Sequence, residues 1–234
     1  MRSYLFVDDN VAFAENLAEI ARDLGDDVAV AGSGAAALEL VARQKFDALV
    51  SDMRMPSMGG AELVHRVRRV DPGLPAIVVT AYTQDDDLAA ARHDGLLAIL
   101  PKPVPIPRLL ELLGLARRDG LVALVEDDIS MSDNLCELLR SRGFAAVTAA
   151  SVLETKRLGE VAPFCGLVDL RVPGGPDGEA MRSLAARFPK LRMMVVTAHG
   201  GERLPFEDTP LFIKPFDSEA LLATVERLHA SQHG

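Results

Sequence analysis

Cysteine, basic charge and long apolar runs are all scarce in this 234-residue chain, and each scarcity removes a class of protein. The two cysteines, Cys136 and Cys165, are too few for a disulfide framework, so the cytoplasm is the expected setting. The sequence holds no run of about 18 apolar residues, so no membrane-spanning helix is predicted. The N-terminus becomes acidic at Asp8 and Asp9, unlike a signal peptide.

The scarcity of basic residues applies to both halves of the chain. Residues 1–118 carry 13 Lys and Arg against 17 Asp and Glu, and residues 119–234 carry 12 against 17, within a net charge of −9. Binding to nucleic acid phosphates needs clustered Lys and Arg. We therefore expect no direct nucleic acid partner, and no membrane partner.

An internal repeat organises the chain. Four segments return in the same order: Val7–Asp9 as Val125–Asp127, Asp52–Pro56 as Asp169–Pro173, Val78–Ala81 as Val195–Ala198, and Lys102–Pro103 as Lys214–Pro215. The offset is 118 or 117 for the first three and 112 for the last, so the second copy is five residues shorter before its lysine. This repeat predicts two domains, 1–118 and 119–234, the second shortened between its fourth and fifth strands.

Between these motifs, short apolar runs alternate with segments of helical periodicity. The alternation predicts five strand–helix units in the first half and a repeat of this pattern in the second, and therefore an α/β fold with a parallel sheet covered on both faces. The units include helices over Asp85–Asp94 and Val152–Glu160. In the second half, His199–Pro210 holds two glycines and two prolines, so we expect no regular fourth helix there.

Each repeated motif follows the carboxyl end of a predicted strand. In a doubly wound sheet these ends meet at one edge, where ligands bind. The side chains expected to converge are Asp8, Asp9, Asp52, Thr80 and Lys102 in the first copy, and Glu126, Asp127, Asp169, Thr197 and Lys214 in the second. Three carboxylates so close repel one another, and Mg²⁺, which prefers oxygen ligands, would resolve this. With a nucleophilic Asp, a hydroxyl and a lysine, the set describes an aspartyl-phosphate site.

These motifs resemble those of the response-regulator receiver family, over essentially the whole chain, twice. The resemblance implies two (βα)5 flavodoxin-like domains with strand order 2-1-3-4-5. It implies that Asp52 accepts phosphate from a sensor histidine kinase or phosphotransfer protein. It further implies that Thr80 and Lys102 contact the phosphoryl group, and that Mg²⁺ binds Asp8, Asp9, Asp52 and the Met53 carbonyl. The matching residues of the second copy are Asp169 as acceptor, Thr197 and Lys214, with Glu126, Asp127, Asp169 and the Leu170 carbonyl as metal ligands. The two Lys–Pro bonds match a position that is usually cis in this family.

The expected function is signalling through contacts with a downstream protein rather than enzymatic turnover. Receivers usually carry an aromatic residue three positions before the lysine, where this chain has Ile99 and Leu211. Together with the missing helix, this favours an alternative in which one or both domains, above all the second, are interaction modules that work without phosphorylation.

Two further interpretations concern enzymatic activity and self-association. A phosphatase of the haloacid-dehalogenase type would also use an Asp nucleophile, but it needs an acid two residues later, where this chain has Arg54 and Arg171. The apolar stretch Leu109–Leu115 is open to two interpretations: burial against the second domain, or a face for a homodimer or partner.

Overall fold

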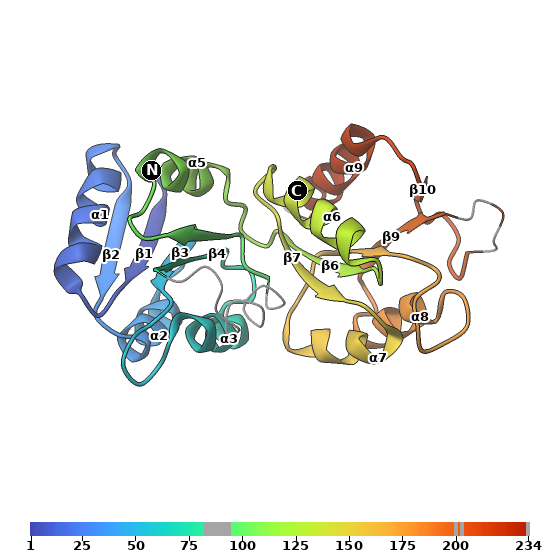
Figure 1. The fold of residues 1–234 in the computed structure, drawn as a ribbon, viewed down its shortest axis with the longest axis horizontal. Coiled ribbons are helices and arrows are strands. Elements are labelled where there is room, and N and C mark those ends of the chain that lie inside the picture. Colours follow the sequence, from blue (N-terminus) through green and yellow to red (C-terminus); the bar gives the residue numbers. More distant parts are fainter. Residues whose placement is uncertain (82–94, 199–200, 202–203, 233–234) are drawn as a thin grey trace. The chain divides into compact units, whose positions relative to one another are not determined.

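The computed structural model describes residues 1–81, 95–198, 201 and 204–232. The chain divides into two compact units, Met1–Asp119 and Gly120–Gly234, and each is described by itself (Figure 1). No helix within the described ranges is both long enough and apolar enough to cross a membrane. The helix expected over Asp85–Asp94 lies outside the described residues.

Unit 1 is a five-stranded parallel sheet with strand order β2-β1-β3-β4-β5. Its elements are β1 (Ser3–Val7), α1 (Val11–Asp23), β2 (Asp27–Ala31), α2 (Gly34–Arg43), β3 (Ala48–Asp52), α3 (Gly60–Val70), β4 (Ala76–Thr80), β5 (Ala98–Pro101) and α5 (Ile106–Leu115). The predicted fold class is therefore confirmed for this unit.

Unit 2 repeats this topology, with strand order β7-β6-β8-β9-β10. Its elements are β6 (Leu121–Val125), α6 (Ile129–Arg140), β7 (Ala145–Ala149), α7 (Val152–Thr155), the 3₁₀ helix η1 (Lys156–Glu160), β8 (Cys165–Val168), α8 (Glu179–Arg187), β9 (Arg192–Thr197), β10 (Leu211–Ile213) and α9 (Ser218–Ala230). The residues described between β9 and β10 form turns and bends without a helix, as predicted.

The second helix of unit 2 is shorter than predicted. We expected one helix over Val152–Glu160, but the α-helix ends at Thr155 and continues as a 3₁₀ helix. The Thr155 hydroxyl donates to the Val152 carbonyl at 2.7 Å. Side-chain bonds of this kind compete with the regular helical ladder, and Gly159 further weakens an α-helix here.

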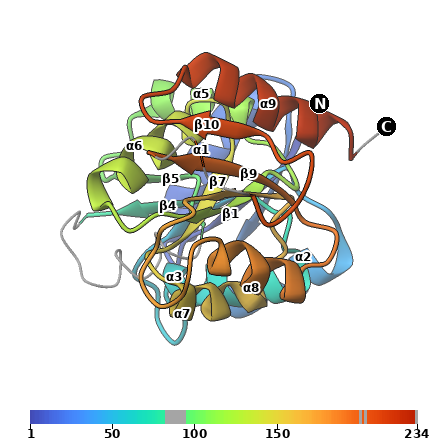
Figure 2. The same ribbon diagram turned by 90° about the vertical axis from the view of Figure 1, so that its right-hand side faces the viewer.

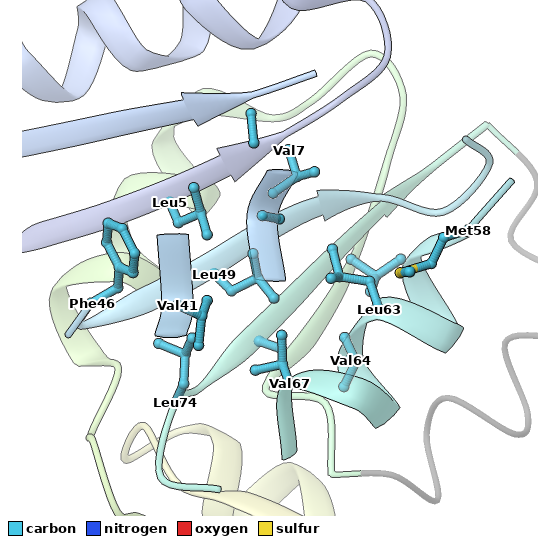
Figure 3. Packing of buried hydrophobic residues seen from close by; sticks show 14 of the residues in the cluster. Leu5, Val7, Val41, Phe46, Leu49, Met58, Leu63, Val64, Val67 and Leu74 are labelled. Atoms are coloured by element: carbon cyan, nitrogen blue, oxygen red, sulfur yellow. The ribbon is translucent and has the colours of Figure 1, made fainter. Parts of the chain in front are cut away.

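Helices pack on both faces of each sheet, and successive side chains of a strand point to opposite faces. In β1, Leu5 and Val7 pack with α2 and α3, whereas Tyr4 and Phe6 pack with α1 and α5. Figure 3 shows the first of these clusters, in which Leu5 and Val7 lie near Leu49 and Leu63. In unit 2, α6 and α9 cover one face of the sheet, and α7 and α8 cover the other (Figure 2).

The apolar stretch of α5 is explained largely within unit 1. Leu109, Leu112 and Leu113 are buried against the sheet, while Leu110 and Leu115 are partly exposed. The excess of leucine in the sequence therefore serves mainly the core of its own unit.

A buried ion pair fixes the end of unit 1. The Arg118 guanidinium donates to both carboxylate oxygens of Asp71, at 2.9 and 2.8 Å, and to the carbonyl of Phe46. The Asp71 side chain is 3% exposed and also pairs with Lys45 at 3.1 Å. Removing one partner of a buried pair leaves the other charge uncompensated.

Asp71→Ala is therefore expected to lower the free energy of unfolding of unit 1 by about 3 kcal/mol, measured by urea denaturation. Glu39→Ala is the matched control, because the Glu39–Arg43 pair spans 3.8 Å with both side chains more than 70% exposed. That pair should contribute about 0–1 kcal/mol. Equal losses in the two variants would contradict this assignment.

Candidate phosphoryl-acceptor sites

Three carboxylates gather at the carboxyl edge of the sheet in unit 1. Asp8 and Asp9 follow β1, and Asp52 is the last residue of β3, the strand paired with β1. One carboxylate oxygen from each lies within 4.8 Å of the others, with Asp8 and Asp52 buried and Asp9 exposed. The three acids predicted to converge therefore do so, and the parallel pairing of the strands is the physical cause.

Lys102 joins two of these carboxylates. Its Nζ lies 2.8 Å from Asp8 Oδ2 and 2.7 Å from Asp52 Oδ1. Its backbone N–H donates to the carbonyl of Thr80, which ends the neighbouring strand β4 and is buried. Partial burial works to lower the pKa of Lys102, but the hydrogen bonds to Asp52 and Asp8 outweigh it and hold the pKa above its usual range. The lysine is therefore charged at neutral pH. The Lys102–Pro103 bond is cis, as predicted.

Backbone groups hold the acidic side chains in place. The Asn10 N–H donates to Asp8 Oδ1 at 2.9 Å, and the Arg54 N–H donates to Asp52 Oδ2 at 3.1 Å. The Met53 carbonyl accepts from the N–H of Gly60 at 2.8 Å. A Cβ at Gly60 would overlap the Asp52 carbonyl oxygen, so only glycine lets α3 begin this close to the acceptor strand.

Unit 2 builds the same arrangement with a longer first acid. Glu126, Asp127 and Asp169 each place an oxygen within 4.8 Å of the others, with the first and third buried. Lys214 Nζ lies 2.6 Å from Glu126 Oε2 and 2.8 Å from Asp169 Oδ2. The Lys214 N–H donates to the carbonyl of Thr197, which ends β9 and is buried.

The backbone of unit 2 also follows that of unit 1. The Arg171 N–H donates to Asp169 Oδ1 at 3.0 Å, and the Leu170 carbonyl accepts from Gly178 N–H at 2.9 Å. The Lys214–Pro215 bond is cis, as predicted. The two sites therefore share their charge arrangement, their lysine contacts and their backbone support.

The ionised form of Glu126 destabilises folded unit 2. Burial raises its pKa, the charge of Asp169 acts in the same direction, and the hydrogen bond from Lys214 opposes both without cancelling them. Between its usual and its raised pKa, the folded protein holds a proton that the unfolded chain releases. Stability therefore falls as the pH rises through that interval, and ionised Glu126 costs stability at neutral pH.

Glu126→Gln is accordingly expected to raise the Tm of unit 2 at pH 7 in a chelating buffer. The gain should disappear below about pH 4, where the carboxyl is neutral in both states. Differential scanning calorimetry measures both, with exposed Glu137→Gln as the control. A lower Tm for Glu126→Gln at pH 7 would show that its pairing with Lys214 outweighs the cost of burial.

Both acidic sets have the chemistry of a hard divalent cation site. Carboxylate oxygens are the ligands that Mg²⁺ prefers, and the exposed Asp9 and Asp127 leave each set accessible from solvent. Lys102 and Lys214 contact carboxylate oxygens that would serve as metal ligands. The two ammonium groups therefore supply positive charge to each acidic set.

One residue close to the first site was missed by the sequence reasoning. The ring of Phe13 lies under the Lys102 ammonium, with Nζ 4.8 Å from the ring centroid. Phe13 follows Asp9 by four residues, in the first turn of α1. Helix α1 begins shortly after the acidic residues that follow β1. An aromatic residue four positions after Asp9 is therefore the sequence signal that could have indicated this contact.

Comparison with known proteins agrees with this geometry. A family model of the response regulator receiver domain matches residues 4–114. A response regulator receiver protein of Anaeromyxobacter sp. (strain Fw109-5) is 65% identical over 229 residues, which cover 98% of this chain and 96% of that protein. The chain therefore belongs to the response regulator receiver family, and its two units are receiver domains in tandem.

Other relatives share one receiver-sized segment. The transcriptional regulatory protein GlrR of Escherichia coli (strain K12) is 32% identical over 128 residues, which cover 55% of this chain and only 26% of that protein. Among solved structures, CheY4 of Vibrio cholerae is 29% identical, with a TM-score of 0.46, over 49% of this chain and 97% of that chain. A receiver protein of Pseudomonas putida is 30% identical, with a TM-score of 0.47, over 48% and 95%.

Proposed function

We propose that this protein is a two-component response regulator that accepts a phosphoryl group on Asp52, and in its second domain on Asp169. The donor would be a sensor histidine kinase or a phosphotransfer protein, and the phosphorylated chain would signal through a downstream protein. The observation that carries the proposal is the lysine–carboxylate arrangement at the strand ends, which occurs twice. Members of this family are normally signalling proteins rather than enzymes.

In the proposed reaction a carboxylate oxygen of Asp52 attacks phosphorus. The P–O bond forms as the P–N bond to the donor histidine breaks, and the bonding electron pair returns to the imidazole nitrogen. Lys102, which already touches Asp52, would pair with an oxygen of the transferred group. The Thr80 hydroxyl would donate to another phosphoryl oxygen, since Thr80 ends the adjacent strand.

The divalent cation would be held by Asp8, Asp9, Asp52 and the Met53 carbonyl, and in unit 2 by Glu126, Asp127, Asp169 and the Leu170 carbonyl. Bound Mg²⁺ supplies positive charge that offsets the repulsion between acceptor and phosphoryl group. The lysine contacts support this assignment, because each acidic set already holds one positively charged partner.

A second candidate function is a phosphorylation-independent interaction module, favoured for unit 2. The residues described between β9 and β10 form no helix, and Leu211 and Ile213 of β10 are 39% and 47% exposed. Strand β10 lies at the edge of its sheet, so these exposed side chains would give unit 2 a different surface for binding a partner. A homodimer through the partly exposed Leu110 and Leu115 also belongs to the proposal, and sedimentation of the phosphorylated and unphosphorylated chain would test it.

The direct test is phosphate incorporation from phosphoramidate, a P–N donor, followed by intact mass spectrometry. The wild-type chain is expected to gain phosphate with Mg²⁺ and none in a chelating buffer. Absence of incorporation with saturating Mg²⁺ would overturn the acceptor function and leave the interaction module as the better account.

A further inference from the structure

Lys102 has a third partner besides its two carboxylates. Its Nζ is 2.8 Å from Asp8 and 2.7 Å from Asp52, and it also lies over the ring of Phe13, 4.8 Å from the centroid. An ammonium group within about 6 Å of a ring centroid is attracted by the negative face of the ring. Phe13 therefore limits where the lysine can go when a carboxylate releases it.

The position of Phe13 is itself fixed. The Asn10 side chain caps α1 by accepting from the N–H of Phe13 at 3.2 Å, and the ring packs partly buried on the cluster under α1. With Asp8 and Asp52, Phe13 also lines a cavity of about 10 Å³, which is at the lower limit for a single water. The ring therefore lies beside both acids that Lys102 contacts, where its negative face attracts the ammonium group.

We propose that Phe13 is a positioning residue for phosphoryl transfer to Asp52, acting through Lys102. The ring holds the ammonium beside the acceptor when Asp8 and Asp52 turn to other partners. Lys102 is then already in place to meet the oxygens of the incoming phosphoryl group. This inference rests on the proposed acceptor function of Asp52.

Unit 2 has a methionine at the position that matches Phe13. Helix α6 starts 118 residues after α1, the same offset as the acidic motif, so Met131 takes the place of Phe13. Met131 is also partly buried on the matching core cluster, but it has no ring face to offer Lys214. The chain therefore supplies its own matched replacement, a methionine that fits this position in the same fold.

The test compares Phe13→Met with Phe13→Tyr, which keeps the ring. With saturating Mg²⁺ and phosphoramidate, the rate of phosphate incorporation at Asp52 is expected to fall about 3- to 10-fold in Phe13→Met and to return to near the wild-type value in Phe13→Tyr. Incorporation at Asp169, mapped by peptide mass, is the internal reference. Equal rates in all three proteins, or equal losses in both variants, would overturn the proposal.

A double-variant comparison separates positioning from general damage to the fold. In a Lys102→Met background, Phe13→Met should cause no further loss, because the group that it positions is gone. A further loss of the same size would mean that Phe13 acts without Lys102 and would overturn the proposal.

A second readout needs no phosphorylation. The sequence has no tryptophan, so Phe13→Trp introduces a single indole under the ammonium. Its emission is expected to change when Lys102→Met is added, and identical spectra would overturn the contact. If the wild-type chain incorporates phosphate but Phe13→Met is normal, only this inference fails. If the wild-type chain incorporates none, the acceptor function fails and the positioning role falls with it.

Discussion

Replacing Lys102 by methionine is expected to slow phosphate incorporation at Asp52 by about 100- to 1,000-fold at saturating Mg²⁺. The lysine is the charged donor that contacts the acceptor, at 2.7 Å. Methionine keeps the length of the side chain but supplies no charge to the oxygens of the transferring group. Such preorganised charge contributes most where water is partly excluded, and the Lys102 side chain is only 27% exposed.

The matched control is Lys214→Met, which removes the equivalent charge from unit 2. It should leave the rate at Asp52 unchanged, because each lysine contacts acids of its own unit. Thermal unfolding of both variants would show that the fold persists. A rate at Asp52 within about twofold of wild type in Lys102→Met would contradict the role given to this residue.

Asp9→Asn is expected to weaken Mg²⁺ binding to unit 1 by about 100-fold or more. Asp9 is the exposed member of the acidic set, so replacing it leaves the packing around Asp8 and Asp52 intact while removing one anionic ligand. Even the loss of a residue that only supports a ligand costs about 10- to 100-fold in metal affinity. Calorimetric titration would measure the change.

Asp127→Asn is the counterpart in unit 2 and isolates the first site. The wild-type chain is expected to bind two ions, and either variant one. The remaining ion would then bind the set that contains Glu126 in Asp9→Asn, and the set that contains Asp8 in Asp127→Asn. If Asp9→Asn kept both ions at unchanged affinity, the acidic set of unit 1 would not be the cation site.

The fold and the gathering of the acids followed from the sequence because both depend on spacing along strands. The repeat offset located the two copies, and the placing of Asp52 and Asp169 at strand ends implied that each would meet its neighbours at one edge. In a parallel sheet the carboxyl ends of the strands lie at one edge, so residues that end neighbouring strands come close together in space. Family resemblance added the Lys–Pro bonds as cis, and the structure agrees.

Side-chain partnerships could not be predicted in the same way. The pairing of Lys102 with both acids and with Phe13 depends on which way a long side chain turns, and spacing does not fix that. The ion pair between Asp71 and Arg118 joins residues 47 positions apart that carry no shared pattern. The early end of α7 depends on a competing side-chain hydrogen bond of Thr155. Each is a tertiary effect that local propensity does not contain.

The measurement that tests the account most directly counts phosphates per chain after reaction with phosphoramidate and Mg²⁺ on three proteins: wild type, Asp52→Ala and Asp169→Ala. The account predicts two phosphates on the wild-type chain and one on each variant, at the remaining aspartate. A single phosphate lost only in Asp52→Ala would make unit 2 an interaction module. Two phosphates retained on either variant would contradict the assignment of these carboxylates as acceptors.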